Sequence, residues 1–466
     1  MNRTDMLGKA VVIYTWLFFF YRILNTLTPV AEVFKQPVFS TVPKLLGLAG
    51  AVLLAVDLIT DRTVLRSASV GWILLLLLSL SVSAAVRYPY NSFFEFTKYI
   101  VYVSVQDLLI YSAGIRMSRE EQKRFLKALH TTASVIFIPA LCYMFYQFVT
   151  RQHYITSEDL NQGWFEGRLF GIMNSLYGGA IVVSLLAFGT VFLLLQSRKP
   201  LQKALYASEL IIFTIYLALS DCRTAYAALA AGLGLALLYH CLRTHSPENS
   251  PMIKVFIKFL IIYTTALLIM FAGIAGIRTA GSYVNAGAAE SRNEMRRPEG
   301  ASFSSRRLTI WNNYIEIMTD KPSHLIFGLS YNGYEKYIRE HYPEAYIVSF
   351  FRNEYPYLYR KGEVYQTHNS YLMVLVVAGL PGVVAVIGFL ISGARYVISL
   401  LFSGGMTSFE SLLSALVLMV LTAGIFETTS IIPVNAVSGF FWMISGLLMN
   451  TKLRKEDPAR TANKLR

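Results

Sequence analysis

The chain alternates between long apolar runs and short polar breaks along its whole length. Twelve runs can be placed, at 8–25, 41–59, 68–86, 98–114, 129–149, 170–195, 205–220, 224–242, 255–277, 370–394, 408–426 and 434–450. Most approach the roughly 20 residues that a helix needs to cross a bilayer. Only helices and closed barrels satisfy the backbone in lipid, and these runs are continuous rather than alternating. The pattern therefore predicts an all-α polytopic membrane protein with about 12 transmembrane helices.

One polar connection is much longer than the others. Residues 278–367 form a stretch of 90 residues between the ninth and tenth runs, and loops this long usually carry function or are disordered. Its first part, GAAESRNEMRRPEGASFSSRR, is polar and expected to be mobile. The next part, RRLTIWNNYIEIMTD, has helical spacing with Leu308, Trp311 and Ile315 on one face, and Lys321-Pro322 ends it. The predicted organisation is nine spans in 1–277, a large extracytoplasmic loop with short helices in 278–367, three spans in 368–450 and a basic cytoplasmic tail in 451–466.

Composition and charge support this picture and orient it. The chain is 55% hydrophobic and only 15% charged, whereas soluble proteins carry about a quarter charged residues, so a soluble enzyme with one anchor is excluded. With the N-terminus inside, the cytoplasmic segments hold 22 Lys and Arg residues and the short outer loops hold 6. This asymmetry places both termini in the cytoplasm. The net charge of +14 then reflects topology and anionic lipid heads more than nucleic-acid binding.

Several polar features fall on the predicted outer side: Arg168 at the start of the sixth span, Arg223 between the seventh and eighth spans, the Arg306–Arg307 pair before the Trp311 helix of the loop, and His368 at the start of the tenth span. Arginines at these positions run against the charge bias, which suggests a specific anion at the membrane surface. The planar guanidinium fork matches phosphate oxygens in pairs, so a lipid-linked phosphate or diphosphate is the expected ligand. The alternative for each arginine is a snorkelling side chain or a structural pair with Asp159, Glu166 or Asp221.

The stretch YQTHNSYLMVLVVAGLPG places His368 and Asn369 directly before a long apolar run. A plain membrane anchor needs no imidazole there, and histidine is the usual base near neutral pH. The alternative is a helix-capping or interfacial histidine. His324 and His341 in the same loop are weaker candidates. Further on, the segment from Gly379 to Gly382 (GLPG) predicts a helix break.

Four short motifs in this order resemble the O-antigen ligase/polymerase superfamily, which includes Wzy-type polysaccharide polymerases and WaaL-type O-antigen ligases. They are RLFGIMN from Arg168, SDCRTA around Arg223, RLTIW from Arg307 with Pro322 and Phe327-Gly328, and HNSYL from His368 with the GLPG segment. The resemblance covers about residues 160–400 in motifs and the whole chain in span number. One departure is Cys222, which stands where the family usually has serine and which weakens any role for a hydroxyl there. At the third motif, spacing to Trp311 favours Arg307 over Arg306.

The resemblance implies glycosyl transfer on the outer face of a bacterial cytoplasmic (inner) membrane, from an undecaprenyl-diphosphate-linked oligosaccharide to an acceptor hydroxyl. It implies that Arg168, Arg223, Arg307 and Arg306 hold the diphosphate, that His368 activates the acceptor, and that no metal or other cofactor is needed. Asn369, Trp311 and Tyr365 are expected to contact the glycan, although an interfacial aromatic belt accounts for most of the loop's tyrosines. A flippase and a chain-length regulator are implied as partners, and nucleic acid is not.

Three functions remain open at this point. A polymerase extends lipid-linked repeat units and is favoured as the commoner role, whereas a ligase transfers the glycan to a lipid A-core, teichoic or protein acceptor. A lipid-linked oligosaccharide flippase is less favoured, because transporters show internal repeats and ionisable groups near the bilayer midplane. Here Asp107 and Glu209 are the main midplane candidates, while the polar side chains gather on one face.

Overall fold

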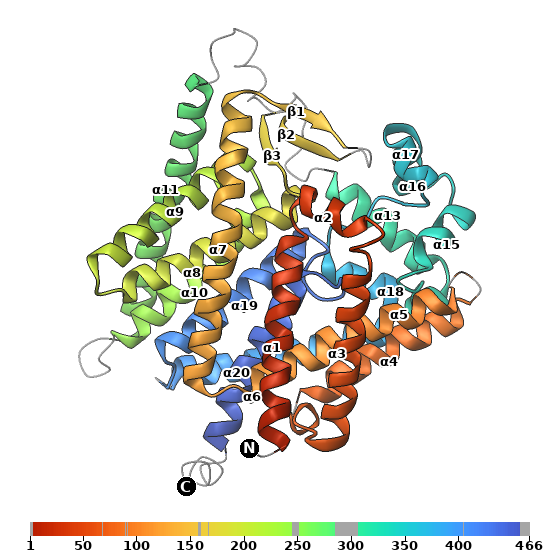
Figure 1. The fold of residues 1–466 in the computed structure, drawn as a ribbon, viewed down its shortest axis with the longest axis horizontal. Coiled ribbons are helices and arrows are strands. Elements are labelled where there is room, and N and C mark those ends of the chain that lie inside the picture. Colours follow the sequence, from red (N-terminus) through yellow and green to blue (C-terminus); the bar gives the residue numbers. More distant parts are fainter. Residues whose placement is uncertain are drawn as a thin grey trace.

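The structure is a computed structural model that describes residues 3–67, 69–88, 90, 92–156, 160–165, 167–244, 251–284, 306–403 and 405–456. Within these residues the chain is mostly helical, and long helices cross one another to form the body of the molecule (Figure 1). The part of the 278–367 segment that was expected to be mobile lies almost entirely outside the described residues.

All twelve apolar runs lie mainly in helical segments. Eleven of the helices are α1 (Arg3–Leu24), α3 (Thr41–Thr60), α4 (Val70–Val86), α7 (Arg119–Val149), α8 (Leu176–Gln196), α9 (Pro200–Ser220), α10 (Arg223–Arg243), α11 (Met252–Val284), α18 (Ser370–Phe402), α19 (Ser408–Phe426) and α20 (Ala436–Glu456). In the described part of the chain, nine helices are long and apolar enough to cross a membrane, and Val70–Val86 and Ala436–Met449 are shorter apolar helices. These helices fit a multi-pass membrane protein. The count of twelve spans stays a prediction.

The fourth run is helical but not a single α-helix. It consists of α5 (Phe93–Ser104), the π-helical segment η2 (Val105–Ile110) and α6 (Tyr111–Arg116). The π segment is fully buried, and the Gln106 amide donates to Ser438 Oγ of α20 at 3.0 Å. Next to it, α6 packs against α20, where Gly114 faces the backbone at Leu447 so closely that a side chain does not fit. Small residues at such contacts let helices pack tightly in lipid.

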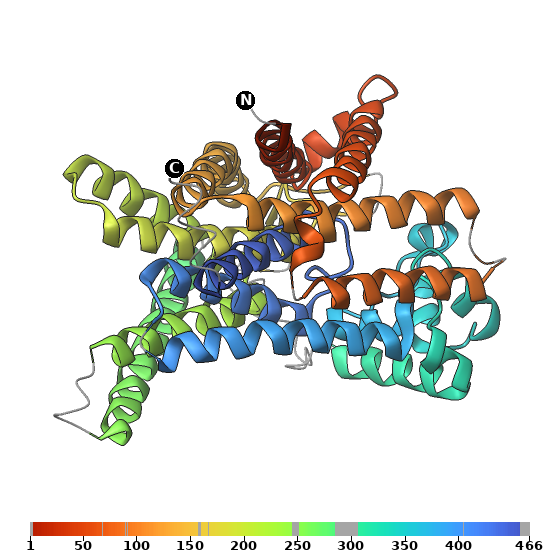
Figure 2. The same ribbon diagram turned by 90° about the horizontal axis from the view of Figure 1, so that it is seen from below.

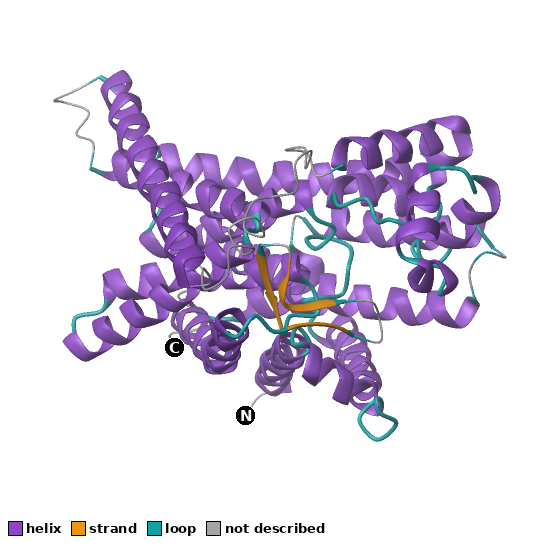
Figure 3. Ribbon diagram, turned by 90° about the horizontal axis from the view of Figure 1, so that it is seen from above, coloured by secondary structure: helices purple, strands orange, loops and turns teal. Residues whose placement is uncertain are grey.

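A small antiparallel sheet departs from the all-helical prediction. It consists of β1 (His153–Ile155), β2 (Asn161–Phe165) and β3 (Arg168–Gly171), in that spatial order, and lies across the helices in Figure 3. The prediction that Arg168 opens a span is therefore wrong: it lies on β3, and α8 begins at Leu176. The apolar residues after Arg168 resemble the start of a helix, but Gly171 has φ of +64°, which ends the strand in a turn.

The end of the 278–367 segment is a compact cluster of short helices. They are α13 (Arg307–Asp320), α14 (Pro322–Phe327), α15 (Tyr334–His341), α16 (Tyr346–Glu354) and α17 (Pro356–Arg360). Figure 2 shows this teal cluster at one end of the long helices of α4, α5 and α18. The short helix α2 (Thr28–Lys35) and the 3₁₀ turn η1 (Val64–Arg66) complete the described elements.

The α13 helix forms and ends as predicted, but it buries a different face. Leu308 and Ile315 are 57% and 47% exposed, whereas Ile310, Tyr314 and Ile317 are buried. Both faces of this helix carry apolar residues, so spacing alone did not decide which one packs. Contacts with α14, α16 and α18 select the Ile310 face.

The predicted helix break in the GLPG segment is confirmed. Gly379 has φ of +66° inside α18, and Gly328, after α14, has φ of +75°. The two backbones approach so closely that a Cβ on Gly328 would lie 2.8 Å from the Gly379 nitrogen. The Leu329 N–H donates to the Val376 carbonyl at 2.6 Å, and the Arg87 guanidinium donates to the Gly328 carbonyl at 2.8 Å. These contacts fasten the short-helix cluster to α18.

Candidate active site

His368 lies in the turn that begins α18. The Asn369 amide oxygen accepts the backbone N–H groups of Tyr371 and Leu372, both at 2.9 Å, and so caps the helix. His368 itself has φ of +45°, a left-handed conformation that is costly for a residue with a side chain. Trp311 Nε1 donates to the Thr367 carbonyl at 2.9 Å on the other side. The backbone around His368 is therefore held in a defined, strained turn.

A buried carboxylate, Glu427, contacts the imidazole. Glu427 follows the last residue of α19, and its carbonyl accepts the Ser370 hydroxyl at 2.7 Å, which joins the end of α19 to the start of α18. Its Oε2 lies 2.9 Å from His368 Nδ1, and its Oε1 lies 2.6 Å from Arg307 Nη2. The Glu427 side chain is only 5% exposed. One carboxylate thus bridges the histidine and the motif arginine.

This bridge assigns the roles of the two imidazole nitrogens. Glu427 only accepts when ionised, so the neutral His368 ring donates through Nδ1–H and keeps the Nε2 lone pair as a proton acceptor. The rings of Tyr365 and Tyr177 stand edge-on to the imidazole at centroid distances of 5.3 and 6.1 Å. They limit the orientations open to the ring.

Arg168 and Arg307 both contact Tyr177. The Arg307 guanidinium is 5.7 Å from the centre of the Tyr177 ring, and Arg168 forms a hydrogen bond with the Tyr177 side chain. Arg168 Nη2 also donates to the Asp221 carbonyl at 3.3 Å. The Asp221 carboxylate, in turn, pairs with Arg278 of α11 at 2.7 Å. Residues of β3, α8, α11 and α13 therefore meet here, beside His368 at the start of α18.

Cys222 is buried at the centre of this group, and Arg223 follows it as the first residue of α10. Glu427, Arg168 and Arg307 all act electrostatically on the Cys222 thiol. Burial is the largest influence and raises the pKa of Cys222 to about 12, so the thiol is protonated near neutral pH and is a poor nucleophile. Arg223 is partly buried and follows Cys222 directly in the chain.

The remaining predicted residues lie around the site in different ways. Arg306 is exposed, and its guanidinium lies over the Phe350 ring at 5.3 Å, towards α16 and not towards Glu427. Tyr365 stacks on Phe350 at 4.8 Å, and burial raises the pKa of Tyr365 to about 12. Asn369 and Trp311 make the backbone contacts described above. Their glycan contacts stay predictions.

The two weaker histidine candidates have structural surroundings. His324 is fully buried, with Nδ1 2.8 Å from the Ile317 carbonyl and Nε2 2.9 Å from the Tyr337 hydroxyl. His341 stacks on Tyr337 at 4.2 Å. Both belong to the packing of the short-helix cluster.

That cluster also contains a partly buried acidic side chain, Glu335. Burial raises its pKa to about 7, against the hydrogen bond from the Tyr334 hydroxyl at 3.0 Å, which lowers it. The nearby Glu363 carboxylate raises it further, and Arg339 lowers it. The short-helix cluster therefore carries a carboxyl that changes charge near neutral pH.

Glu427 was not identified from the sequence. It is a single carboxylate immediately after an apolar run, and no known motif pointed to it. The available signal was its position: an acidic residue at the predicted outer end of a span, on the side where the motif arginines were expected.

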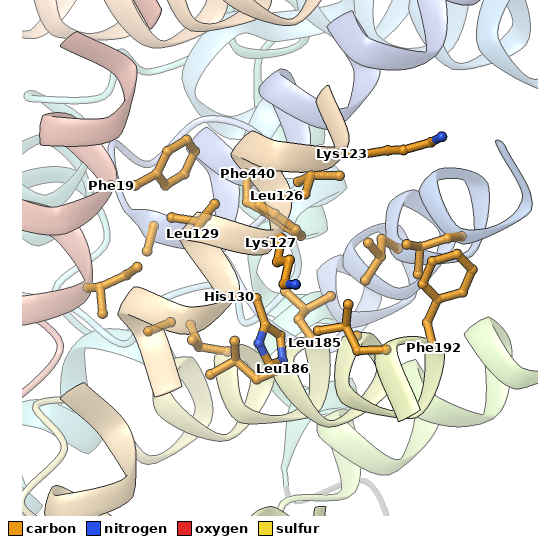
Figure 4. A pocket seen from close by; sticks show the side chains of 18 of the residues that line it. Phe19, Lys123, Leu126, Lys127, Leu129, His130, Leu185, Leu186, Phe192 and Phe440 are labelled. Atoms are coloured by element: carbon orange, nitrogen blue, oxygen red, sulfur yellow. The ribbon is translucent and has the colours of Figure 1, made fainter. Parts of the chain in front are cut away.

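A separate, apolar cavity of about 230 Å³ lies among α1, α7, α8, α19 and α20. Figure 4 shows its lining of leucine and phenylalanine side chains, with Lys123, Lys127 and His130 of α7. None of the motif arginines lines it. Within the described ranges, no group of three or more His, Cys, Asp or Glu side chains could hold a metal ion.

Chemically, the site places an imidazole beside a group of arginine side chains. Among the described residues, Arg278 pairs with Asp221, Arg307 pairs with Glu427, and Arg168 Nη2 donates to the Asp221 carbonyl, while Arg223 begins the neighbouring helix α10. Such a group of arginines stabilises negative charge as it develops next to the Nε2 base.

Comparison with known proteins agrees with the motifs. Residues 209–387 match the family model described as O-antigen ligase. This region contains Arg223, Arg307 and His368. No curated protein matches the chain significantly. Through residues 209–387, the chain is therefore similar to the O-antigen ligase family, which supports the resemblance to the O-antigen ligase/polymerase superfamily.

Proposed function

We propose that this protein is a membrane glycosyltransferase that polymerises undecaprenyl-diphosphate-linked oligosaccharide repeat units on the outer face of the bacterial cytoplasmic membrane. The observation that carries the proposal is the bridge from Arg307 through the buried Glu427 carboxylate to His368. It joins a cationic surface to an oriented base, and the family match supports this class of activity.

The arginines bind the donor in this proposal. Arg168, Arg223 and Arg307 hold the diphosphate oxygens, for which the guanidinium fork is suited. Arg307 is already oriented by its contact with Glu427 at 2.6 Å, so little freedom is lost on binding. Arg306 lies farther out over Phe350 and is assigned a role in attracting the donor rather than clamping it.

His368 then activates the acceptor. Its Nε2 takes the proton of the acceptor hydroxyl as that oxygen bonds to the anomeric carbon of the donor sugar. The bond from this carbon to the diphosphate oxygen breaks, and its electron pair stays on the diphosphate. Glu427 stabilises the imidazolium that forms, and the arginines stabilise the charge on the leaving group. No step requires a metal, so we expect activity in the presence of a chelator.

Transfer to a different acceptor is the second candidate, because the matching family model is described as O-antigen ligase. The donor chemistry is the same in both, and the acceptor decides between them. A transporter would instead use Asp107 and Glu209, which are 0% and 7% exposed and lie in η2 and α9.

The test uses purified protein in lipid nanodiscs with a fluorescent undecaprenyl-diphosphate oligosaccharide and EDTA. Longer lipid-linked chains support polymerase activity. Products appearing only when another acceptor is added support the ligase. Movement of the lipid across proteoliposomes without any new glycosidic bond contradicts both.

A further inference from the structure

A second cavity lined by basic side chains lies between α1, α3 and α5. Its volume is about 250 Å³, and its lining includes Arg22, Lys44, Lys98 and three tyrosines, Tyr14, Tyr21 and Tyr102. No carboxylate is among the lining residues in the described chain. Lys98 pairs with Glu95 outside the lining at 3.6 Å, a contact between two side chains that are each about half exposed. The charged side chains that line the cavity are therefore all basic within the described chain, and we call it the cationic cavity.

Arg22 is one of the three basic residues and has a buried donor without a partner among the described residues. Its guanidinium lies against the Phe18 and Tyr21 rings, at 5.2 and 5.4 Å from their centres. Its Nε atom is buried and, in the part of the chain that the structure describes, has no hydrogen-bond partner. A buried donor without an acceptor is costly, and more so in a charged group. An anion in the cavity supplies the missing acceptor.

This cavity lies on the same side of the molecule as His368. The segment after α1 is bonded to the segment before α8: the Thr28 N–H donates to the Ile172 carbonyl at 2.8 Å, and the Asn174 N–H donates to the Thr26 carbonyl at 2.9 Å. Figure 1 shows the corresponding end of α1, with α2, next to β3. Arg168 of the active site lies on that strand.

A third cavity has one lining residue, Tyr21, in common with the cationic one. Its volume is about 430 Å³, and its lining includes Asn174 and Ser175. Tyr177, which contacts Arg168, Arg307 and His368, follows two residues later. Asn25, Glu32 and Lys35 also line this cavity, so it offers polar groups to a sugar chain.

We infer that Arg22, Lys44 and Lys98 bind the diphosphate of the second lipid-linked substrate, the acceptor. The inference rests on the proposed polymerase function: when one lipid-linked glycan is transferred to another, two diphosphates are bound at once, and a single clamp holds only one. The lipid tail has a suitable surface beside the cavity, because Leu17 of α1 and Leu45 and Leu48 of α3 are 44%, 63% and 63% exposed.

The first experiment counts bound lipids. Undecaprenyl diphosphate is titrated into the detergent-solubilised full chain, and its stoichiometry is measured by native mass spectrometry. We expect two lipids per wild-type chain and one for both Lys44→Gln and Arg22→Gln. Lys44 is exposed, so Lys44→Gln should fold and still tests the lipid site if Arg22→Gln does not fold. The control is Lys127→Gln, an exposed lysine that lines the separate apolar cavity; it should keep two.

The second experiment measures transfer with donor and acceptor varied separately. Loss of a charge-assisted contact should raise the acceptor KM of Lys44→Gln by about tenfold and leave the donor KM unchanged. Two bound lipids in both Lys44→Gln and Arg22→Gln, or an unchanged acceptor KM, overturn the inference even if the wild type polymerises. Saturable binding of inorganic diphosphate that is lost in Lys44→Gln, together with only one bound undecaprenyl diphosphate in the wild type, assigns the cavity to a free anion and also overturns the inference.

The two experiments separate this inference from the proposed function. A wild type that binds two lipids, loses one in Lys44→Gln and forms no glycosidic bond supports the second lipid site and refutes the polymerase proposal.

Discussion

Replacing Glu427 by glutamine tests whether the His368 base depends on its buried partner. The change keeps the size of the side chain but removes the negative charge that lies 2.9 Å from His368 Nδ1 and 2.6 Å from Arg307 Nη2. A glutamine NH₂ directed at Nδ1 donates a hydrogen bond, which favours the tautomer with the proton on Nε2. In that tautomer, Nε2 carries a proton and has no lone pair with which to accept the proton of the acceptor hydroxyl.

The expected loss follows from what the base contributes. General-base assistance is worth about 10²–10⁴-fold in rate, or roughly 3–5 kcal/mol of barrier. We expect Glu427→Gln to lower kcat within this range. The donor KM should not rise, because removing a carboxylate leaves the diphosphate site more positive. Glu427→Asp keeps the charge and should recover part of kcat.

Stability must be measured alongside the rate, because the same change leaves the Arg307 guanidinium without its partner. The guanidinium side chain is 12% exposed, and breaking a buried ion pair typically costs about 3–5 kcal/mol. Glu410→Gln is the matched control: Glu410 is also buried, on the same helix, and caps its opposite end. It should lower the unfolding temperature and leave kcat of the folded enzyme unchanged.

The assay is steady-state elongation of lipid-linked oligosaccharide by purified variants, with thermal unfolding measured on the same samples. A Glu427→Gln enzyme with wild-type kcat and a raised donor KM would refute the reasoning, since Glu427 would then only shape the arginine surface. Equal losses of kcat in Glu427→Gln and Glu410→Gln would refute it as well.

Three further changes test other parts of the account. Arg223→Lys and Arg307→Lys keep the charge but lose the two-pronged contact, so polymer formation should fall at least tenfold while membrane insertion stays normal. A cysteine at Glu344 should react with an impermeant thiol reagent in intact cells (spheroplasts if an outer membrane is present), and one at Lys123 should not. The pKa of Glu335 is raised from 4.5 to about 7 in the folded state, so the wild type should be fully stabilised by this carboxyl below pH 4.5 and should lose about 3 kcal/mol of unfolding free energy as the pH rises to about 7. Glu335→Gln should remove this loss, which thermal unfolding from pH 4 to 8 measures.

Controls and contrary results for these three are as follows. The control for the arginine changes is Lys336→Arg, which keeps the charge of an exposed residue of α15 and should not alter polymer formation. Near-normal polymer from both Arg223→Lys and Arg307→Lys would indicate that only the positive charge matters. For labelling, Cys142 is exposed and must first be replaced; labelling only at Lys123 would move the site to the cytoplasm. A Glu335→Gln protein with wild-type pH dependence would mean that this carboxyl does not control the loss.

Hydrophobic continuity was sufficient to predict the helices, since each apolar run lies mainly in helical structure. It was insufficient where short segments fold through long-range contacts. The sheet around Arg168 has strands of three to five residues whose pairing depends on turns, and the apolar residues after Arg168 were absorbed into the next run. The buried face of α13 depended on which partner helix lay beside it, and the sequence did not contain that information.

The sequence identified the candidate residues that belong to motifs. It did not identify Glu427, which only its place in the fold distinguishes. Arg307 and His368 are 61 positions apart in the chain, and both contact Glu427. Glu427 became visible only when the ends of α18 and α19 were placed together. For Asn369, the sequence suggested a contact with substrate, and the structure adds that its side-chain oxygen caps α18. The contact with substrate stays a prediction.

The central claim is that His368 is the base of a transfer whose donor is held by the arginines. The most direct test measures donor binding and glycan transfer on the same preparation of His368→Ala. The account predicts a folded protein that binds undecaprenyl-diphosphate oligosaccharide with near wild-type affinity and elongates it at least 10²-fold more slowly. Elongation at the wild-type rate by His368→Ala would contradict it.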